Sequence, residues 1–237
     1  MRQRKIKNVE EKIENYGHMI IDDPKEMKGK WNQVFGNDKP IYLEIGCGKG
    51  QFIVNNAISY PDRNFIAVEG HMSVCYRALA KAAGDEKFQW EAPEDQQQDE
   101  AKFMACDGAL ENIRFIREYI DEITDYFEDD ELAGIYLNFS DPWPKKKHAK
   151  RRLTYGKKLK GYERVIENGG RLQFKTDNDG LFEYSVEQIE ECGLKVEAIT
   201  RDLHNSEFLE GNIETEYEYK FSIRGKNINY VLCKIEK

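Results

Sequence analysis

The stretch PIYLEIGCGKG, residues 40–50, decides the fold. Its first half is a short apolar run that begins at a proline, which indicates a buried β-strand. Its second half has glycine at every second position, and such a turn lets the backbone pass close to a ligand. Apolar residues with helical spacing follow, from Phe52 to Tyr60. The stretch therefore predicts a strand, a glycine turn and a helix, which together start a βαβ unit.

Strands and helices alternate through the rest of the chain. Short apolar runs predict four further strands, at residues 65–68, 103–106, 135–139 and 171–175. Apolar residues at helical spacing predict four further helices, at residues 73–83, 110–123, 159–166 and 181–191. Segments 217–223 and 229–235 have the pattern of an antiparallel hairpin. This order predicts an α/β fold with a doubly wound, mostly parallel sheet and a C-terminal antiparallel hairpin.

Length and composition agree with one domain in a reducing compartment. The 237 residues suit a single domain spanning 1–237, and we expect its N-terminal extension, 1–35, to be partly mobile. No apolar run approaches the ~20 residues of a membrane-spanning helix. The five cysteines are an odd number without metal-ligand spacing. We therefore expect a cytoplasmic protein, monomer or homodimer, with no membrane association, no metal and no obligate protein partner.

Charge is distributed unevenly along the chain. The net charge is −8, but residues 85–131 hold 17 acidic and 4 basic side chains, or −13, which leaves +5 for the rest. Residues 145–160 contain nine Lys and Arg and no acidic residue. Such a cluster is typical of a solvated helix face and equally of a polyanion-binding surface. The acidic average therefore does not exclude nucleic acid as a partner.

Several candidate ligand contacts fall at the carboxyl ends of the predicted strands, where open α/β sheets bind ligands. Gly46 and Gly48 belong to the turn after the first strand. Glu69 follows the second strand, near the ~20-residue offset at which an acid meets ribose hydroxyls, and Asp107 follows the third. Glu44 lies inside the first strand, where a charge is unusual unless it faces a ligand. Each acid alone is equally typical of a strand end or a helix cap. Together they favour an adenosine-containing ligand, and the glycine spacing fits S-adenosylmethionine better than NAD.

The most specific pattern follows the fourth predicted strand. Residues 138–154 read NFSDPWPKKKHAKRRLT, and the prolines that flank Trp143 stiffen the loop. We expect this loop to place Asp141 at the mouth of the ligand cleft, beside the basic cluster. Here the chain resembles the bacterial tRNA (guanine-N7)-methyltransferase family. The other matching motifs are LEIGCGKG (43–50), VEG (68–70), FKTDN (174–178) and TEYE (215–218).

The resemblance implies a fold, a reaction and a set of site residues. The fold is a Rossmann-like methyltransferase. The reaction transfers the methyl group of S-adenosylmethionine to N7 of a guanine in the tRNA variable loop, at position 46 of standard tRNA numbering. The implied cofactor contacts are Glu44, Gly46, Gly48, Glu69, Asp107 and Asp141, and Asp141 is also the implied catalytic residue. The implied tRNA contacts are Lys145, Lys147, Lys150, Arg151, Arg152, Asp177, Thr215, Glu216, Tyr217 and Glu218. The chain departs from the family at Lys147, where arginine is usual, and in a more acidic segment near 88–102.

Guanine chemistry suits these residue types. The N7 lone pair needs no base, so correct positioning should dominate, and it can supply ~7 to 11 kcal/mol of the barrier. Methylation leaves a cationic purine, and we assign Asp141 to orienting the base and stabilising that charge. Three other functions stay open at this stage. They are a methyltransferase for another RNA base or a small molecule, a non-catalytic RNA-binding protein with a vestigial pocket, and an NAD oxidoreductase.

Overall fold

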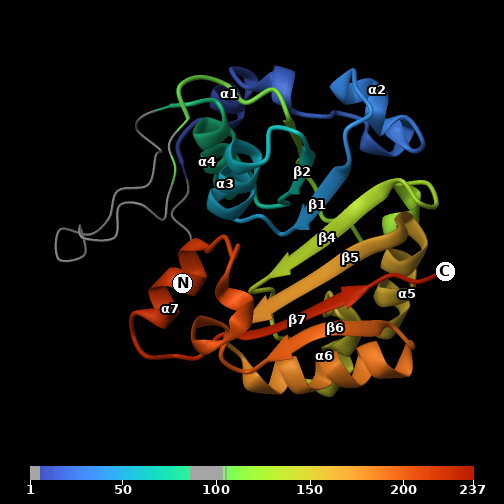
Figure 1. Cartoon of the computed structure of the whole chain (residues 1–237). Coiled ribbons are helices and arrows are strands. Elements are labelled where there is room, and N and C mark those ends of the chain that lie inside the picture. The colour runs from blue at the N-terminus through green and yellow to red at the C-terminus, as the bar shows by residue number, and fades with distance from the viewer. Residues whose placement is uncertain (1–5, 86–103, 105) are drawn as a thin grey trace.

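The computed structural model describes residues 6–85, 104 and 106–237 (Figure 1). At its centre is a seven-stranded sheet with the order β3-β2-β1-β4-β5-β7-β6. The strands are β1 (Ile41–Ile45), β2 (Asn64–Val68), β3 (Ile113–Ile116), β4 (Leu132–Asn138), β5 (Ile166–Thr176), β6 (Lys195–Thr200) and β7 (Asn229–Lys234). Strands β1 to β5 are parallel to one another, whereas β7 runs antiparallel to both β5 and β6. The predicted fold class is confirmed.

Helices connect the strands and cover both faces of the sheet. The α-helices are α1 (Val9–Glu14), α2 (Trp31–Phe35), α3 (Gln51–Ser59), α4 (Met72–Ala82), α5 (Gly156–Val165), α6 (Asp179–Glu191) and α7 (Glu216–Ser222). The 3-10 turns are η1 (Gly17–Met19), η2 (Pro24–Met27), η5 (Ile123–Asp125), η6 (Lys146–Arg151), η7 (Leu203–Asn205) and η8 (Glu207–Leu209). Helices α3 and α4 lie on one face, and α5 and α6 lie on the other (Figure 1).

The two faces of the sheet have separate hydrophobic cores, because neighbouring residues of a strand point to opposite faces. Ile66 of β2 packs in the core that contains Leu159 of α5. Its neighbour Phe65 packs in the core that contains Ile53 of α3 and Leu79 of α4. A strand buried on both faces is a continuous apolar run in sequence. This double burial explains why β1 and β2 were predictable from the sequence alone.

The helix predicted at 110–123 is wrong. Residues 113–116 form β3, which pairs in parallel with β2. Asn112 anchors the start of β3, since its side-chain amide donates a hydrogen bond to the carbonyl oxygen of Arg63 at 3.0 Å. The apolar spacing fits a helix, but pairing with the open edge of β2 overrides that local preference. Of the strand predicted at 103–106, residues 103 and 105 lie outside the described residues, and Met104 and Cys106 are not part of a strand.

The first strand predicted for the C-terminal hairpin is also wrong. Residues 217–223 lie in and just after helix α7, and the antiparallel partner of β7 at this end of the chain is β6. A capping box starts α7. The Thr215 hydroxyl accepts a hydrogen bond from the Glu218 N–H at 2.9 Å, and the Glu218 carboxylate accepts one from the Thr215 N–H at 3.4 Å. The T-x-x-E spacing in the sequence is the signature of this motif.

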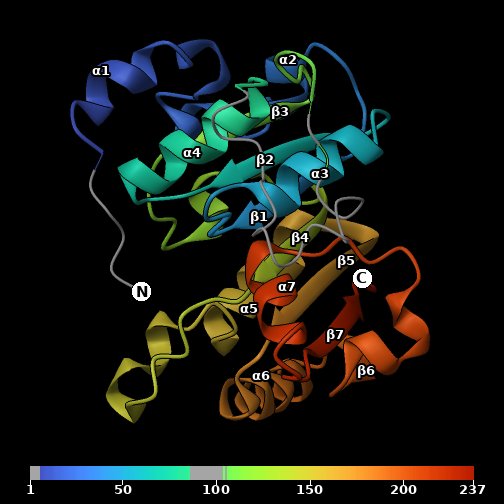
Figure 2. The same ribbon diagram turned by 90° about the vertical axis from the view of Figure 1, so that its left-hand side faces the viewer.

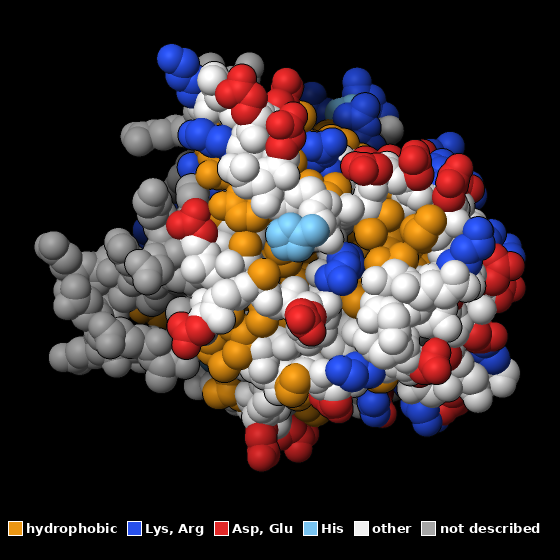
Figure 3. Space-filling model, turned by 90° about the horizontal axis from the view of Figure 1, so that it is seen from above, with side chains coloured by type: hydrophobic (Ala, Val, Ile, Leu, Met, Phe, Trp, Pro, Cys, Tyr) orange, Lys and Arg blue, Asp and Glu red, His pale blue; other side chains and the backbone are white. Residues whose placement is uncertain are grey.

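The N-terminal part of the chain packs against the β3 side of the sheet. Ile20 forms a parallel bridge with Phe115 of β3. Trp31 is fully buried, and its indole N–H donates a hydrogen bond to the carbonyl oxygen of Tyr126 at 2.9 Å. The surface over α1 and α2 mixes acidic and basic side chains rather than showing one sign of charge (Figure 3). Within the described part of the chain, no helix has the length and apolar character needed to cross a membrane.

Candidate functional site

The glycine turn lies at the carboxyl edge of the sheet, where β1 to β4 end; Figure 2 looks onto this edge. Gly46, Gly48 and Gly50 have φ values of +80°, +59° and +81°, which glycine adopts readily and other residues do not. A Cβ atom on Gly46 or Gly48 would meet no atom within 4 Å, so the turn borders open space. A Cβ atom on Gly50 would lie 2.6 Å from the Cβ of Ala78. The first two glycines therefore leave room for a ligand, and the third lets α4 pack closely.

Glu69 connects the end of β2 to the glycine turn. Its carboxylate accepts hydrogen bonds from the N–H of Gly48 at 3.1 Å and from the N–H of His71 at 2.7 Å. Burial raises the pKa of Glu69, and the negative charge of Asp141 raises that pKa further. The loop that carries Asp141 begins after Asn138, the last residue of β4, and β4 pairs in parallel with β1. The glycine turn follows β1, so the two loops leave neighbouring strands at the same edge of the sheet. A place for the Asp141 side chain in the site stays a prediction.

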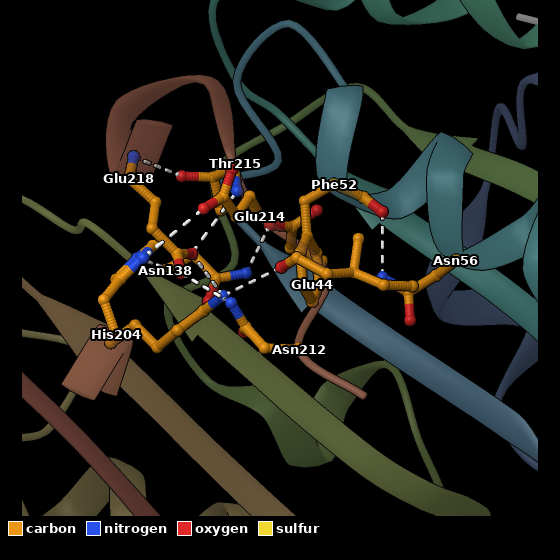
Figure 4. Close-up of polar contacts among 11 residues, drawn as sticks. Glu44, Phe52, Asn56, Asn138, His204, Asn212, Glu214, Thr215 and Glu218 are labelled. Carbon is orange, nitrogen blue, oxygen red and sulfur yellow. Dashed lines mark hydrogen bonds and ion pairs between the residues drawn. The ribbon is translucent and has the colours of Figure 1, made fainter. Parts of the chain in front are cut away.

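Glu44 on β1 and Asn138 on β4 lie side by side at this edge of the sheet (Figure 4). Glu44 is 2% exposed, and its Oε1 accepts a hydrogen bond from Nδ2 of Asn138 at 2.8 Å. The other carboxylate oxygen of Glu44 and the side-chain oxygen of Asn138 are buried without a hydrogen-bond partner in the described residues. Burial raises the pKa of Glu44 to about 8, although Asn138 and Lys175 act in the opposite direction. Buried acceptors without donors are costly, so this pair suits a ligand that brings a cation or a donor.

The loop that carries Asp141 has a strained backbone. Phe139 and Trp143 have φ values of +50° and +41°, which bulky residues rarely adopt. The Arg152 guanidinium donates hydrogen bonds to the carbonyl oxygens of Pro142 and Trp143, both at 3.1 Å. Strain of this kind persists only where the surroundings enforce it, and it is common at functional sites. Arg152, predicted as a tRNA contact, thus has a structural role in holding the loop.

The segment that carries the exposed basic residues projects from the body of the molecule, as the yellow ribbon of Figure 2 shows. Among the predicted tRNA contacts, the exposed cations are Lys145, Lys147, Lys150 and Arg151. Further along the basic cluster, Lys157 and Lys158 form ion pairs with Glu122 and Asp121. The surface available to a polyanion is therefore narrower than the sequence cluster and centres on residues 145–151.

Glu218 of the TEYE segment lies in the interior instead of at the surface. It is fully buried, and its Oε2 lies 2.6 Å from the Nζ of Lys175, which is fully buried as well. Its Oε1 accepts a hydrogen bond from Asn212 at 2.7 Å and lies 3.2 Å from Nε2 of His204 (Figure 4). Lys175 also donates to the carbonyl oxygen of Ile213 at 3.0 Å. These contacts fasten the segment before α7 to the end of β5.

Glu216 links α7 to the glycine turn and to α4 through two ion pairs. Its carboxylate lies 3.0 Å from Nζ of Lys49 and 2.5 Å from Nζ of Lys81. Although burial raises the pKa of Glu216, the two ammonium groups hold it below its usual value. Tyr217 is exposed, and its ring stacks on Phe139 with 6.3 Å between ring centres. Of the four TEYE residues, Tyr217 is therefore the best placed to touch a substrate.

Two predicted acids differ in their placement. Asp107 is exposed and precedes β3, so the prediction that it follows the third strand is wrong. The error has the same origin as the false helix at 110–123. The neighbouring Gly108 lies against Gly84, just beyond the end of α4. A role for Asp107 in cofactor binding stays a prediction. Asp177 directly follows β5 and is half-buried.

Sequence reasoning missed the buried polar partners of this site. Asn138 ends the otherwise apolar strand β4, and that contrast could have marked it, as it marked Glu44. Lys175 lies in β5, where other polar residues remove such a contrast. Lys49 and Lys81 gave no comparable signal, because Lys49 lies in a turn and Lys81 in the last turn of α4, where a lysine is common in any helix. Their role depends on Glu216, which is far away in the sequence.

One cluster near α7 has the residue types of a metal site. His204, Glu214 and Glu218 bring three potential ligand atoms within 4.8 Å of one another. Glu218, however, already receives the Lys175 ammonium at 2.6 Å and the Asn212 amide at 2.7 Å. Its acceptor positions are taken by hydrogen-bond donors, and the neighbouring cation opposes a second positive charge. The cluster is an ion-pair network that stabilises the segment before α7.

Known proteins resemble the chain over most of its length. The family model described as "Putative methyltransferase" matches residues 38–231. The chain is 44% identical over 228 residues to the tRNA (guanine-N(7)-)-methyltransferase of Pediococcus pentosaceus, covering 96% of this chain and 97% of the relative. It is 43% identical to the protein of the same name from Streptococcus pyogenes serotype M6, with the same coverage.

Solved structures share the fold at low sequence identity. One described as an antibiotic-related methyltransferase has a TM-score of 0.60 at 12% identity, covering 94% of this chain and 98% of that one. The 16S rRNA methyltransferase KamB has a TM-score of 0.60 at 16% identity, covering 88% and 94%. These likenesses show a common architecture for the chain.

Proposed function

The chain belongs to the tRNA (guanine-N7)-methyltransferase family, and from this premise we propose that it methylates the guanine at position 46 in the tRNA variable loop. It is an enzyme that transfers a methyl group from S-adenosylmethionine to N7 of guanine in tRNA. The observation that carries the proposal is that the glycine turn, Glu44 and the start of the Asp141 loop lie on the neighbouring strands β1 and β4, at one edge of the sheet. We propose that residues 1–237 act as a single domain, in the cytoplasm.

The residues of the cleft fit S-adenosylmethionine, which when bound supplies a methyl group from a positively charged sulfonium. Gly46 and Gly48 border open space that a ligand can enter. The unpartnered oxygen of Glu44 offers an acceptor to a cationic or hydrogen-bond-donating group. Glu69 lies at the end of β2, where an acid can accept hydrogen bonds from ribose hydroxyls. These features support a cofactor site between the glycine turn and the ends of β1 and β2.

Methyl transfer needs positioning and charge stabilisation from the protein, not a base. The lone pair of guanine N7 attacks the methyl carbon, and the electron pair of the broken carbon–sulfur bond stays on sulfur. The guanine ring gains the positive charge. We propose that the Asp141 carboxylate accepts hydrogen bonds from the base and stabilises this charge as it forms. The strained backbone at Phe139 and Trp143, fixed by Arg152, holds Asp141 in place.

The exposed cations at 145–151 should contribute the salt-dependent part of tRNA binding. Replacing Lys147, Lys150 and Arg151 together with Ala should reduce the slope of log affinity against log salt concentration by about 2 to 3, since each phosphate contact contributes about 0.9. Filter binding over a series of salt concentrations measures this slope. Lys157→Ala is the matched control, because Lys157 already pairs with Glu122. An unaltered slope in the triple variant would remove this segment from the interface.

Cofactor affinity should increase with pH up to about 8. Burial raises the pKa of Glu44 to about 8, so the group is mostly protonated at neutral pH in the free protein. A cationic ligand favours the carboxylate, and binding must then release a proton. The dissociation constant should fall by up to about tenfold per pH unit below pH 8 and level off above it. By the same linkage, Glu44 stabilises the ligand-free fold less as the pH rises through about 8.

Isothermal titration calorimetry with S-adenosylmethionine at several pH values tests this dependence. Glu44→Gln cannot ionise, so the variant should bind more weakly and show no such slope. An equal slope in the wild type and in Glu44→Gln would contradict the assignment.

Nucleoside mass spectrometry of tRNA after incubation with labelled S-adenosylmethionine tests the reaction itself. We expect labelled 7-methylguanosine. A different labelled nucleoside would support a methyltransferase for another RNA base. Unlabelled tRNA would support a non-catalytic RNA-binding protein.

A further inference from the structure

An exposed tyrosine lies just after β3, at the carboxyl edge of the sheet. Tyr119 follows β3 by three residues, and its side chain is 76% exposed, more than any other large hydrophobic side chain in the described residues. The next residue, Ile120, is 8% exposed and belongs to the core, so it fixes the backbone and leaves the tyrosine outside. Aromatic side chains carry a large apolar surface, and an exposed ring offers a face on which a planar group can stack.

The ring of Tyr119 lies directly on Gly70. A Cβ atom on Gly70 would lie 2.5 Å from two of the ring carbons and 2.6 Å from a third. Gly70 is not among the glycines with positive φ, so its backbone conformation does not require glycine. The ring of Tyr119 requires glycine here, because it occupies the space that a side chain would need. Gly70 directly follows Glu69, whose carboxylate accepts a hydrogen bond from the glycine turn at Gly48. One face of the aromatic ring is thus supported by the backbone at the end of β2.

Among the residues that directly follow β3, Arg117, Glu118 and Tyr119, only the tyrosine has an aromatic ring. That ring is exposed and lies on the backbone at the end of the neighbouring strand β2. In the sheet order β3-β2-β1-β4, this position lies on the opposite side of β1 from the Asp141 loop.

We propose that Tyr119 is the platform on which the adenine ring of S-adenosylmethionine stacks. The proposal rests on the proposed function, since it places the methyl group near Asp141 and the adenosine end toward β2 and β3. Stacking of a base on an aromatic side chain is worth about 1 to 3 kcal/mol and needs no hydrogen-bonded partner. It gives the enzyme an adenine contact after the third strand, where the sequence suggested the carboxylate of Asp107.

Affinity for S-adenosylhomocysteine, measured by calorimetry, tests the platform. Tyr119→Ala should weaken binding by roughly 5- to 150-fold, and Tyr119→Phe should bind like the wild type because the ring is kept. Ile199→Ala is the matched control, since Ile199 is 45% exposed on β6, at the far end of the sheet. It should leave the affinity unchanged. Wild-type affinity in Tyr119→Ala would overturn the proposal.

A double-mutant cycle with Gly70 gives a second test. Gly70→Ala should push the ring away and weaken S-adenosylhomocysteine binding. In the Tyr119→Ala background the added methyl group has no ring to meet, so Gly70→Ala should cost little more. Losses that add in the double variant would show that the two residues act independently and would contradict the platform.

Steady-state kinetics separate this proposal from the proposed function. Tyr119→Ala should raise KM for S-adenosylmethionine while kcat and KM for tRNA stay close to wild type. A raised KM for tRNA with unchanged cofactor affinity would assign the ring to the tRNA side and overturn the platform, while methyl transfer itself would stand. Absence of methyl transfer in the wild type would instead refute the proposed function.

Discussion

Asp141→Asn should reduce the methyl-transfer rate by about 100- to 1000-fold while the fold stays intact. The substitution keeps the shape of the side chain and removes the negative charge, which we propose stabilises the developing cationic purine. Asp141 is exposed, and the loop is held by hydrogen bonds from Arg152 to backbone carbonyls. Thermal unfolding should therefore change little. Single-turnover kinetics at saturating tRNA and S-adenosylmethionine measure the chemical step.

Asp62→Asn is the matched control for this variant. Both aspartates are exposed, but Asp62 lies just before β2 starts, at the opposite edge of the sheet, so its loss should leave the rate of the chemical step close to wild type. If Asp141→Asn kept a wild-type single-turnover rate, the carboxylate would have no catalytic role and the cleft would act through positioning alone.

Lys175→Met should have the largest effect on stability, a loss of about 3–5 kcal/mol in the free energy of unfolding. The variant leaves the carboxylate of Glu218 buried without the ammonium that lies 2.6 Å away in the wild type. Although burial raises the pKa of Glu218, Lys175 and its other partners hold it at about 2. The wild-type pair therefore stabilises the fold above the ordinary glutamate pKa of 4.5, and this contribution is lost as the pH falls through about 2.

Denaturant unfolding of matched variants tests the buried pair. The double variant Lys175→Met with Glu218→Gln should recover much of the loss, because no uncompensated charge remains. Arg171→Met, on the same strand, removes an exposed ion pair with Glu197 and should cost at most about 1 kcal/mol. If Lys175→Met lowered the free energy of unfolding by no more than Arg171→Met does, the buried ion pair would contribute no more to stability than an exposed one.

The elements that sequence predicted well are those whose signal is local. Strands β1 and β2 are buried on both faces, so each is a short apolar run in the sequence. The glycine turn that follows β1 can be recognised from five consecutive residues. The apolar pattern of residues 113–116 fits a helix and a strand equally well. These residues form a strand because they pair with the open edge of β2. Because a helix was predicted over these residues, the third strand was expected earlier in the chain, at 103–106. Asp107 was therefore expected to follow that strand.

The sequence predicted the loops of the candidate site but not the buried ion pairs beneath them. Asp141 and the glycine turn lie in compact sequence motifs. Loops that follow parallel strands lie at the same edge of the sheet, so the sequence could place both motifs at that edge. The inward position of Glu216 depends on Lys49, which is 167 residues away in the chain. Glu218 likewise depends on Lys175, 43 residues away. Contacts over such separations leave no periodic trace in a single sequence, so both acids were expected at the tRNA surface.

Chemical mapping of the methylated guanine tests the central claim most directly. Borohydride reduction and aniline cleavage break an end-labelled tRNA at 7-methylguanosine. After incubation with the enzyme and S-adenosylmethionine, we predict one cut, at the variable-loop guanine, and its loss when Asp141→Asn replaces the wild type. A cut at another guanine, or an equally strong cut with the variant, would contradict the account.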